Sequence, residues 1–339
     1  MFTMFTEAKV EVVSFLAKKY FDRKPRVVLE EINGATLGSA ETLDKEQGKY
    51  QDAANHYYYV YLNSEELPVR ARALLGCVQQ LINLGSYPQA LRFLDTRSGY
   101  ISDRLSFNDQ TIFNAEIEGK KGWISDYMLN YRGSARHFSE AAEILLKIPR
   151  AQWNPDAKEL YSTTRHFLGR ACYGLAFFGI NKKEKIAEAV EYFAQAYRLD
   201  REYEGIDVNA KLGFGQAWLA RCCILDGDSA LTDHYATNAL DYFEQQLVIT
   251  PENKDSSAHG ELLQGERVLR FETAASARRH FLEALRVRQN EAPYPRGEAD
   301  AYLGIALSYK KEWNIPQFIH YANLGRQTHV GALKRLLGG

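Results

Sequence analysis

The sequence has few of the residues that mark secreted, membrane or zinc proteins. Only four of its 339 residues are cysteines, and none stands in a paired Cys-x-x-Cys arrangement of the kind that binds zinc. The start of the chain lacks a secretory type of apolar segment, so we expect reduced thiols and a cytoplasmic location. Apolar runs such as 171–180 are far shorter than the roughly 20 residues of a membrane span. We therefore expect no membrane-spanning segment.

An excess of charge and the common catalytic motifs are also missing. Lysine and arginine number 42 against 43 for aspartate and glutamate, so the formal net charge is -1. Such a chain has no global field that attracts a phosphate backbone, which argues against nucleic acid as a general partner. It carries no phosphate loop, zinc-type HExxH, nucleophile elbow or dinucleotide glycine pattern. We expect no enzyme, no cofactor and no metal ion.

Helix-forming residues dominate what is present. Prolines number only nine, and apolar residues recur at three- and four-residue spacing within long stretches rich in alanine, leucine, glutamate, lysine, glutamine and arginine. The alternation of apolar and polar residues that is typical of strands is nearly absent. The sequence therefore predicts an all-α fold.

One short pattern recurs seven times along the chain. In it, an apolar residue is followed by a small residue three positions later and a bulky residue four positions after that, all expected on one face of a helix. A small residue between two larger ones lets a second helix approach closely. Each copy follows another amphipathic segment, which predicts helix pairs in series that bury their apolar faces against one another. The copies are Tyr50, Ala53 and Tyr57; Tyr87, Ala90 and Leu94; Phe138, Ala141 and Leu145; Ile186, Ala189 and Phe193; Ala236, Ala239 and Phe243; Ala274, Ala277 and Phe281; and Trp313, Pro316 and His320.

A leucine-glycine pair marks several of the preceding segments. A glycine inside a helix costs about 1 kcal/mol relative to alanine, so its recurrence predicts a close contact with an adjacent backbone. The marked glycines are Gly38, Gly76, Gly169, Gly213 and Gly304.

Two stretches resemble the tetratricopeptide repeat family most clearly. They are LINLGSYPQAL at Leu81–Leu91 and QGKYQDAANHYY at Gln47–Tyr58, and both are similar to the hairpin turn of that family. The resemblance implies a right-handed α-solenoid of about seven stacked antiparallel helix pairs. The seven small residues are separated by 37, 51, 48, 50, 38 and 39 positions, whereas the family repeat is about 34 residues long. We therefore expect unusually long helices or extended loops in the central units.

The pattern also predicts how the chain is divided. Residues 1–33 are expected to hold one further helix that caps the first pair, and residues 34–330 the repeat array. Residues 331–339 are expected to form a short tail.

The resemblance implies a concave groove that is lined by the first helix of each pair and binds a protein or peptide. The offset from the leucine-glycine marks or the hairpin turn selects the groove-facing side chains, which are rich in arginine, amide and aromatic groups. For each residue singly, packing between helices is at least as good an interpretation. The selected residues are Arg72, Gln79, Asn83, His166, Arg170, Tyr173, Phe214, Trp218 and Tyr309.

A run of tyrosines suggests a second candidate surface. Of Tyr57, Tyr58, Tyr59 and Tyr61, only the first and last share a helix face. Tyr58 and Tyr59 are therefore candidates for a partner or self-association surface, and burial against the N-terminal helix is the alternative.

Two functions fit these features. One is a scaffold or adaptor that holds a protein or peptide in the groove, and the other is a peptide-sensing regulatory subunit whose output module is on another chain. No output module is visible in the sequence, which favours the scaffold. An all-helical enzyme is the third and least favoured alternative.

Overall fold

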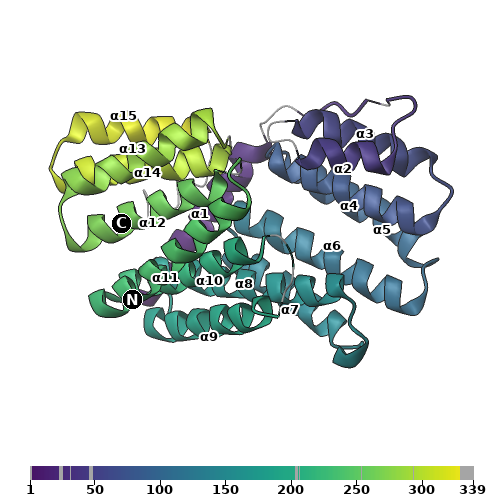
Figure 1. The fold of residues 1–339 in the computed structure, drawn as a ribbon, viewed down its shortest axis with the longest axis horizontal. Helices are drawn as coiled ribbons and strands as arrows, with labels where there is room; N and C mark the ends of the chain where they lie inside the picture. The colour runs from purple at the N-terminus through teal and green to yellow at the C-terminus, as the bar shows by residue number, and fades with distance from the viewer. Residues whose placement is uncertain are drawn as a thin grey trace. The chain divides into compact units, whose positions relative to one another are not determined.

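The computed structural model describes residues 2–22, 26–30, 32–45, 49–202, 205, 207–252, 254–292 and 294–328. Within these ranges the chain forms α-helices and one 3-10 turn, and contains no strand, which confirms the predicted all-α fold (Figure 1). None of the described helices is both long and apolar enough to cross a bilayer. The tail predicted at 331–339 lies outside the described residues.

Fourteen of the described helices form seven consecutive pairs. The pairing is antiparallel because short turns connect neighbouring helices that pack side by side. A single N-terminal helix, α1 (Phe2–Asp22), precedes them. The pairs are α2 (Leu37–Lys45) with α3 (Tyr50–Asn63), α4 (Leu67–Asn83) with α5 (Tyr87–Ser102), α6 (Phe107–Tyr127) with α7 (Tyr131–Leu145), α8 (Pro155–Phe177) with α9 (Lys182–Asp200), α10 (Val208–Asp226) with α11 (Ser229–Ile249), α12 (Asp255–Phe271) with α13 (Ala274–Asn290), and α14 (Pro295–Lys311) with α15 (Ile315–Thr328).

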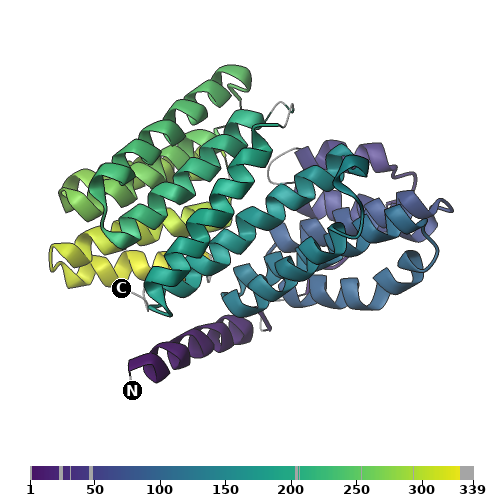
Figure 2. The same ribbon diagram turned by 90° about the horizontal axis from the view of Figure 1, so that it is seen from below.

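Contacts along the chain group the residues into two compact units. The N-terminal unit is Ser14–Phe167, and the C-terminal unit is Leu168–Gly339 together with Met1–Val13. Figure 2 shows the long helices of the C-terminal unit side by side. The expected division into a capping helix at 1–33 and an array at 34–330 stays a prediction.

The small residue of the repeat is the point of closest packing in the second helices. Six alanines at this position are 0% exposed, as expected for residues that let a neighbouring helix approach. They are Ala53, Ala90, Ala141, Ala189, Ala239 and Ala277. The seventh copy differs, because Trp313 precedes α15, and Pro316 and His320 are exposed on it. Pro316 lies in the first turn, where proline is tolerated.

The glycines of the first helices contact aromatic rings, which corrects the expectation of backbone contact. A Cβ atom on Gly76 would lie 2.5 Å from the ring of Tyr57, and one on Gly169 would lie 2.8 Å from the ring of Phe193. Gly213 meets the ring of Phe243 in the same way, and also approaches a backbone oxygen at 3.3 Å. Gly38 has no such neighbour. The bulky residue of a second helix therefore fills the space that the glycine leaves open.

Long helices account for the wide spacing of the central repeats. Helices α6 and α11 contain 21 residues each, and α8 contains 23. Of the two alternatives left by the sequence, extended helices rather than extended loops take up most of the additional residues.

The N-terminal segment holds the expected helix and then runs along the array. Phe21 on α1 packs edge-to-face against Tyr87 of α5, with 4.4 Å between ring centroids. Beyond α1, the side chain of Gln89 on α5 accepts a hydrogen bond from the Val27 amide and donates one to the Val27 carbonyl, both at 2.9 Å. Asn55 of α3 accepts from the Glu30 amide at 3.1 Å. This segment thus contacts the second helices of the first two pairs.

Candidate partner-binding groove

A groove in the N-terminal unit is lined by the first helices of four consecutive pairs. Its walls come from α2, α4, α6 and the start of α8, and its volume is about 570 Å³. All of its lining residues, from Asp44 to Thr163, belong to this one unit. The first helices thus line the groove, in the way that the resemblance implied.

Aromatic rings of the second helices pack directly against glycines of the first helices that form the groove. Tyr57 of α3 lies under Gly76, and Phe138 of α7 lies under Gly122, with ring atoms 2.5 Å and 2.7 Å from the position of a Cβ atom. Both rings line the groove. Both rings are almost fully buried, and a larger residue at either glycine would collide with the ring. Trp123 of α6 adds a third ring to the lining.

Polar side chains connect neighbouring first helices across the groove. Lys120 of α6 donates a hydrogen bond to Gln79 of α4 at 2.6 Å, and its ammonium lies 4.7 Å from the centroid of the Trp123 ring. The indole nitrogen of Trp123 is buried and has no hydrogen-bond partner. A buried donor without a partner costs free energy.

Asp44 of α2 is held in place by two donors. Gln80 of α4 donates to one carboxylate oxygen at 2.5 Å, and the hydroxyl of Tyr57 donates to the other at 3.2 Å. Burial raises the pKa of Tyr57, and the neighbouring Asp44 carboxylate raises it further. Tyr57 therefore stays a neutral donor at physiological pH.

The groove lining is acidic. It contains two basic side chains, Arg72 and Lys120, and the first of these is paired at 3.0 Å with Glu41, outside the lining. Five carboxylates face them, and the lining therefore carries an excess of negative charge. The carboxylates are Asp44, Asp109, Glu116, Asp156 and Glu159.

This environment shifts the pKa values of two charged residues of α6. Burial raises the pKa of Glu116 and the Asp156 carboxylate adds to the shift, whereas Lys120 and Arg72 oppose it. Burial lowers the pKa of Lys120, against the opposing effect of Glu116 and Asp44. Charged groups in this groove therefore lack part of the solvation that they would have in water.

The predicted groove residues of the N-terminal unit separate into three groups. Arg72 and Gln79 line the groove. Asn83 lies one turn beyond Gln79 on α4, accepts from its side chain at 3.0 Å and donates to Gln80 at 3.1 Å. His166 is not among the lining residues, and its ring packs edge-to-face on Phe167 at 5.7 Å.

In the C-terminal unit, three of the predicted residues form one cluster. Trp218 of α10 contacts the guanidinium groups of Arg170 and Arg221, whose central carbons are 5.3 Å and 4.9 Å from a ring centroid of the indole. Tyr173 of α8 meets the same indole edge-to-face at 5.3 Å. Arg221 is also paired with Glu266 of α12 at 2.7 Å. Cation-π contacts therefore join the first helices of two neighbouring pairs.

The remaining two predicted residues pack between helices. Phe214 of α10 contacts Phe243 at 5.4 Å and His259 at 4.7 Å, both edge-to-face. Tyr309 of α14 stacks on Tyr321 of α15 at 5.7 Å, and the guanidinium of Arg278 lies 3.7 Å from its ring centroid. Both residues belong to the margins of core clusters.

The tyrosine run of α3 is divided between core and margin. Tyr57 and Tyr61 are only 4% and 7% exposed, whereas Tyr58 and Tyr59 are half-buried. The ring of Tyr58 lies 6.0 Å from Phe93 of α5. Its aromatic contact is thus with the second pair, and the surface proposed for Tyr58 and Tyr59 stays a prediction.

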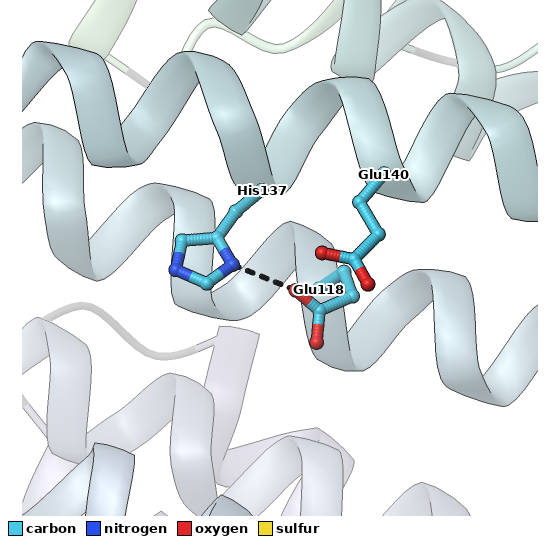
Figure 3. A group of neighbouring side chains, drawn as sticks. All are labelled: Glu118, His137 and Glu140. Carbon is cyan, nitrogen blue, oxygen red and sulfur yellow. Dashed lines mark hydrogen bonds and ion pairs between the residues drawn. The ribbon is translucent and has the colours of Figure 1, made fainter.

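A cluster of potential metal ligands lies on α6 and α7 (Figure 3). Glu118, His137 and Glu140 each offer a ligand atom, and these atoms lie within 4.8 Å of one another. Arginine can only donate, so the contact of Arg136 with Nε2 of His137 at 3.2 Å makes that nitrogen an acceptor. The other ring nitrogen then donates to Glu118 at 2.7 Å.

Glu118 is also engaged by a lysine. Burial raises the pKa of Glu118, but hydrogen bonds from His137 and Lys121 outweigh it and lower the pKa. The Lys121 ammonium lies 3.0 Å from the carboxylate. The cluster is accounted for by an ion pair within α6 and a hydrogen bond from His137 of α7.

Sequence reasoning did not select Glu116, Lys120, Trp123 or Asp156. The offset rule depended on a leucine-glycine mark, and α6 carries its glycines at Gly119 and Gly122 without a preceding leucine. The aromatic Trp123 directly after Gly122 is the signal that points to this helix.

No protein-family model matches the chain, and no curated protein matches it. Among solved structures, BtubC (BKLC) from P. vanneervenii is 14% identical over 72% of this chain and 91% of its own, with a TM-score of 0.47. Cut9–Hcn1, a hetero-tetramer of the APC/C, is 13% identical over 86% of this chain and 73% of its own, with a TM-score of 0.27. The quorum sensor NprR from B. thuringiensis, in its apo form, is 10% identical over 86% of this chain and 96% of its own, also with a TM-score of 0.27. Because all three TM-scores are below 0.5, none of these structures supports a function for this chain. The proposed function is based on the geometry of the groove.

Proposed function

We propose that this chain is a non-catalytic scaffold or adaptor of the tetratricopeptide-like type that holds a protein or peptide segment in the groove of the N-terminal unit. The observation that supports it most is that four consecutive first helices line one groove with an aromatic floor and polar walls. A volume of about 570 Å³ accommodates a few side chains of a partner, and the aromatic floor suits an apolar anchor. The free, buried state of all four cysteines fits a reducing compartment such as the cytoplasm.

The second candidate is the regulatory subunit of a peptide-sensing system. It is favoured by the hydrogen bonds that join successive first helices, from Lys120 to Gln79 and from Gln80 to Asp44. A bound peptide that replaces these bonds would alter the spacing of α2, α4 and α6 and so transmit binding to an output on another chain.

Panning a random peptide display library on the full-length chain tests the scaffold proposal. A Gln79→Trp variant fills the groove from the α4 wall, and Arg92→Trp on α5, exposed and outside the lining, is the matched control. We expect enriched peptides to bind the unmodified chain and the control equally, and the groove variant at least about tenfold more weakly. Thermal melts verify that both variants are folded. Peptides that bind Gln79→Trp unchanged, or no enrichment at all, would overturn the proposal.

A further inference from the structure

The walls of the groove carry charged side chains, whereas its floor carries none. This contrast indicates which side chains of a partner fit the groove. The floor is uncharged, and of its aromatic residues Trp123 is half-buried, whereas Tyr57 and Phe138 are almost fully buried. One wall, formed by α6 and the start of α8, brings Glu116 and Asp156 to the same groove. Two carboxylates that approach each other in a partly desolvated site repel, and a cation placed between them relieves that repulsion.

Lys120 does not neutralise this wall completely. Its ammonium is directed to the α4 side by the hydrogen bond to Gln79, and to the Trp123 ring by the cation-π contact. The second basic residue of the lining, Arg72, is paired with Glu41. Both cations also lower the pKa of Glu116, but the lining holds five carboxylates against these two cations.

Trp123 adds a half-buried aromatic ring to the groove. Its indole N–H is buried without a hydrogen-bond partner, and the residue lines the groove. Because the indole nitrogen is closed to solvent, a partner would pack on the ring rather than accept from this donor.

We infer that the groove recognises a segment of a partner protein in which a lysine or arginine stands beside an apolar side chain. The cationic group lies against Glu116 and Asp156, and the apolar side chain packs on the ring of Trp123. This inference rests on the proposed function, because it names the partner chemistry of the same groove. Charge complementarity sets which segments bind, and the aromatic floor supplies much of the affinity.

The test uses one synthetic peptide family against the full-length chain. Short peptides with a fixed leucine carry lysine, arginine, norleucine or glutamate at the neighbouring position, and binding is measured by fluorescence anisotropy at two salt concentrations. We expect lysine and arginine peptides to bind at least about tenfold more tightly than the norleucine peptide, with an advantage that shrinks at higher salt. The glutamate peptide should bind most weakly.

Isosteric variants locate the charge contact. The double variant Glu116→Gln, Asp156→Asn should bind the lysine peptide at least about tenfold more weakly. Its affinity for the norleucine peptide should stay unchanged. Glu140→Gln with Glu143→Gln, on the α7 helix and outside the lining, is the matched control and should change neither. Spermidine supplies free cations without an apolar side chain, and should not displace the lysine peptide at equal concentration.

The outcomes separate the two proposals. Equal binding of the lysine and norleucine peptides, with both lost in Gln79→Trp, would overturn the charge inference and leave the scaffold function standing. Preference for glutamate, or unchanged lysine-peptide binding in the Glu116→Gln, Asp156→Asn variant, would likewise overturn it, as would displacement by spermidine. Absence of binding by every peptide would count against both.

Discussion

At the scale of single residues, the most unusual environment surrounds His259 on α12. Burial lowers its pKa from 6.5 to about 3, Arg288 and Arg221 lower it further, and Asp255 and Asp300 oppose the shift. Asp255 lies 3.5 Å from the ring and is ion-paired with Arg288, whose side chain is 0% exposed. Phe214 packs on the ring from α10. Protonation of this histidine would place a second cation beside a buried arginine.

This histidine should make the stability of the chain depend on pH. Because the pKa of His259 is lower in the folded chain than in the unfolded chain, its contribution is complete above about pH 6.5 and is lost as the pH falls toward about 3. Between pH 6.5 and 5 the unfolding free energy should fall by about 2 kcal/mol on account of this group. Urea unfolding at pH 7.5 and 5.0 should show a smaller fall in His259→Gln.

His234→Gln on α11 is the control, because that side chain is exposed. It should retain the fall seen in the unmodified chain. An equal fall in His259→Gln and in the unmodified chain would contradict the assignment.

At the scale of elements, the second helix of each of the first six pairs carries a buried alanine where the helices approach. Ala189 on α9 is 0% exposed and packs among Cys172 and Ala176 of α8, Phe193 of its own helix, and Leu219 of α10. Alanine has the volume that this contact allows, so a longer side chain has no space without moving a helix.

Ala189→Leu should therefore reduce the unfolding free energy by about 1–3 kcal/mol through overpacking. Ala187→Leu lies two residues away on the exposed face of the same helix and should change it by less than about 0.5 kcal/mol. Thermal and urea unfolding of the two variants give the comparison. Similar stabilities for both would show that α9 is not packed through Ala189.

At the scale of the whole molecule, helices in each unit contact mainly their neighbours in the chain. The Phe281 ring shows how one side chain joins successive pairs, because Gly265 of α12 and Gly304 of α14 both lie against it. A Cβ atom on Gly265 would lie 2.6 Å from this ring. Arrays with such nearest-neighbour contacts respond locally to a perturbation.

Gly265→Ala should therefore lower the unfolding free energy by about 1–3 kcal/mol and raise hydrogen exchange in α12–α15 of the C-terminal unit. Helices α3–α7 of the N-terminal unit should keep their exchange rates. Gly99→Ala on α5 is the matched control, because a Cβ atom there meets nothing within 4 Å, and alanine favours a helix more than glycine does. A uniform rise in exchange over all helices would contradict nearest-neighbour coupling.

The sequence by itself determined the all-α class, the number of helix pairs and the positions of closest packing. These follow from local rules, because the spacing of apolar residues sets the buried face of a helix and a small residue such as Ala141 marks where a neighbour approaches. The same rules placed Arg72 and Gln79 on a first helix that lines the groove.

The tertiary structure alone decided which polar side chains meet. Glu116 and Asp156 are 40 positions apart in the chain and come together because α6 and α8 are first helices of successive pairs that line one groove. The same packing turned Phe214 and Tyr309 toward neighbouring helices, although their spacing had selected them for a groove. Periodicity within a helix fixes one face, whereas the stacking of whole pairs sets what that face contacts.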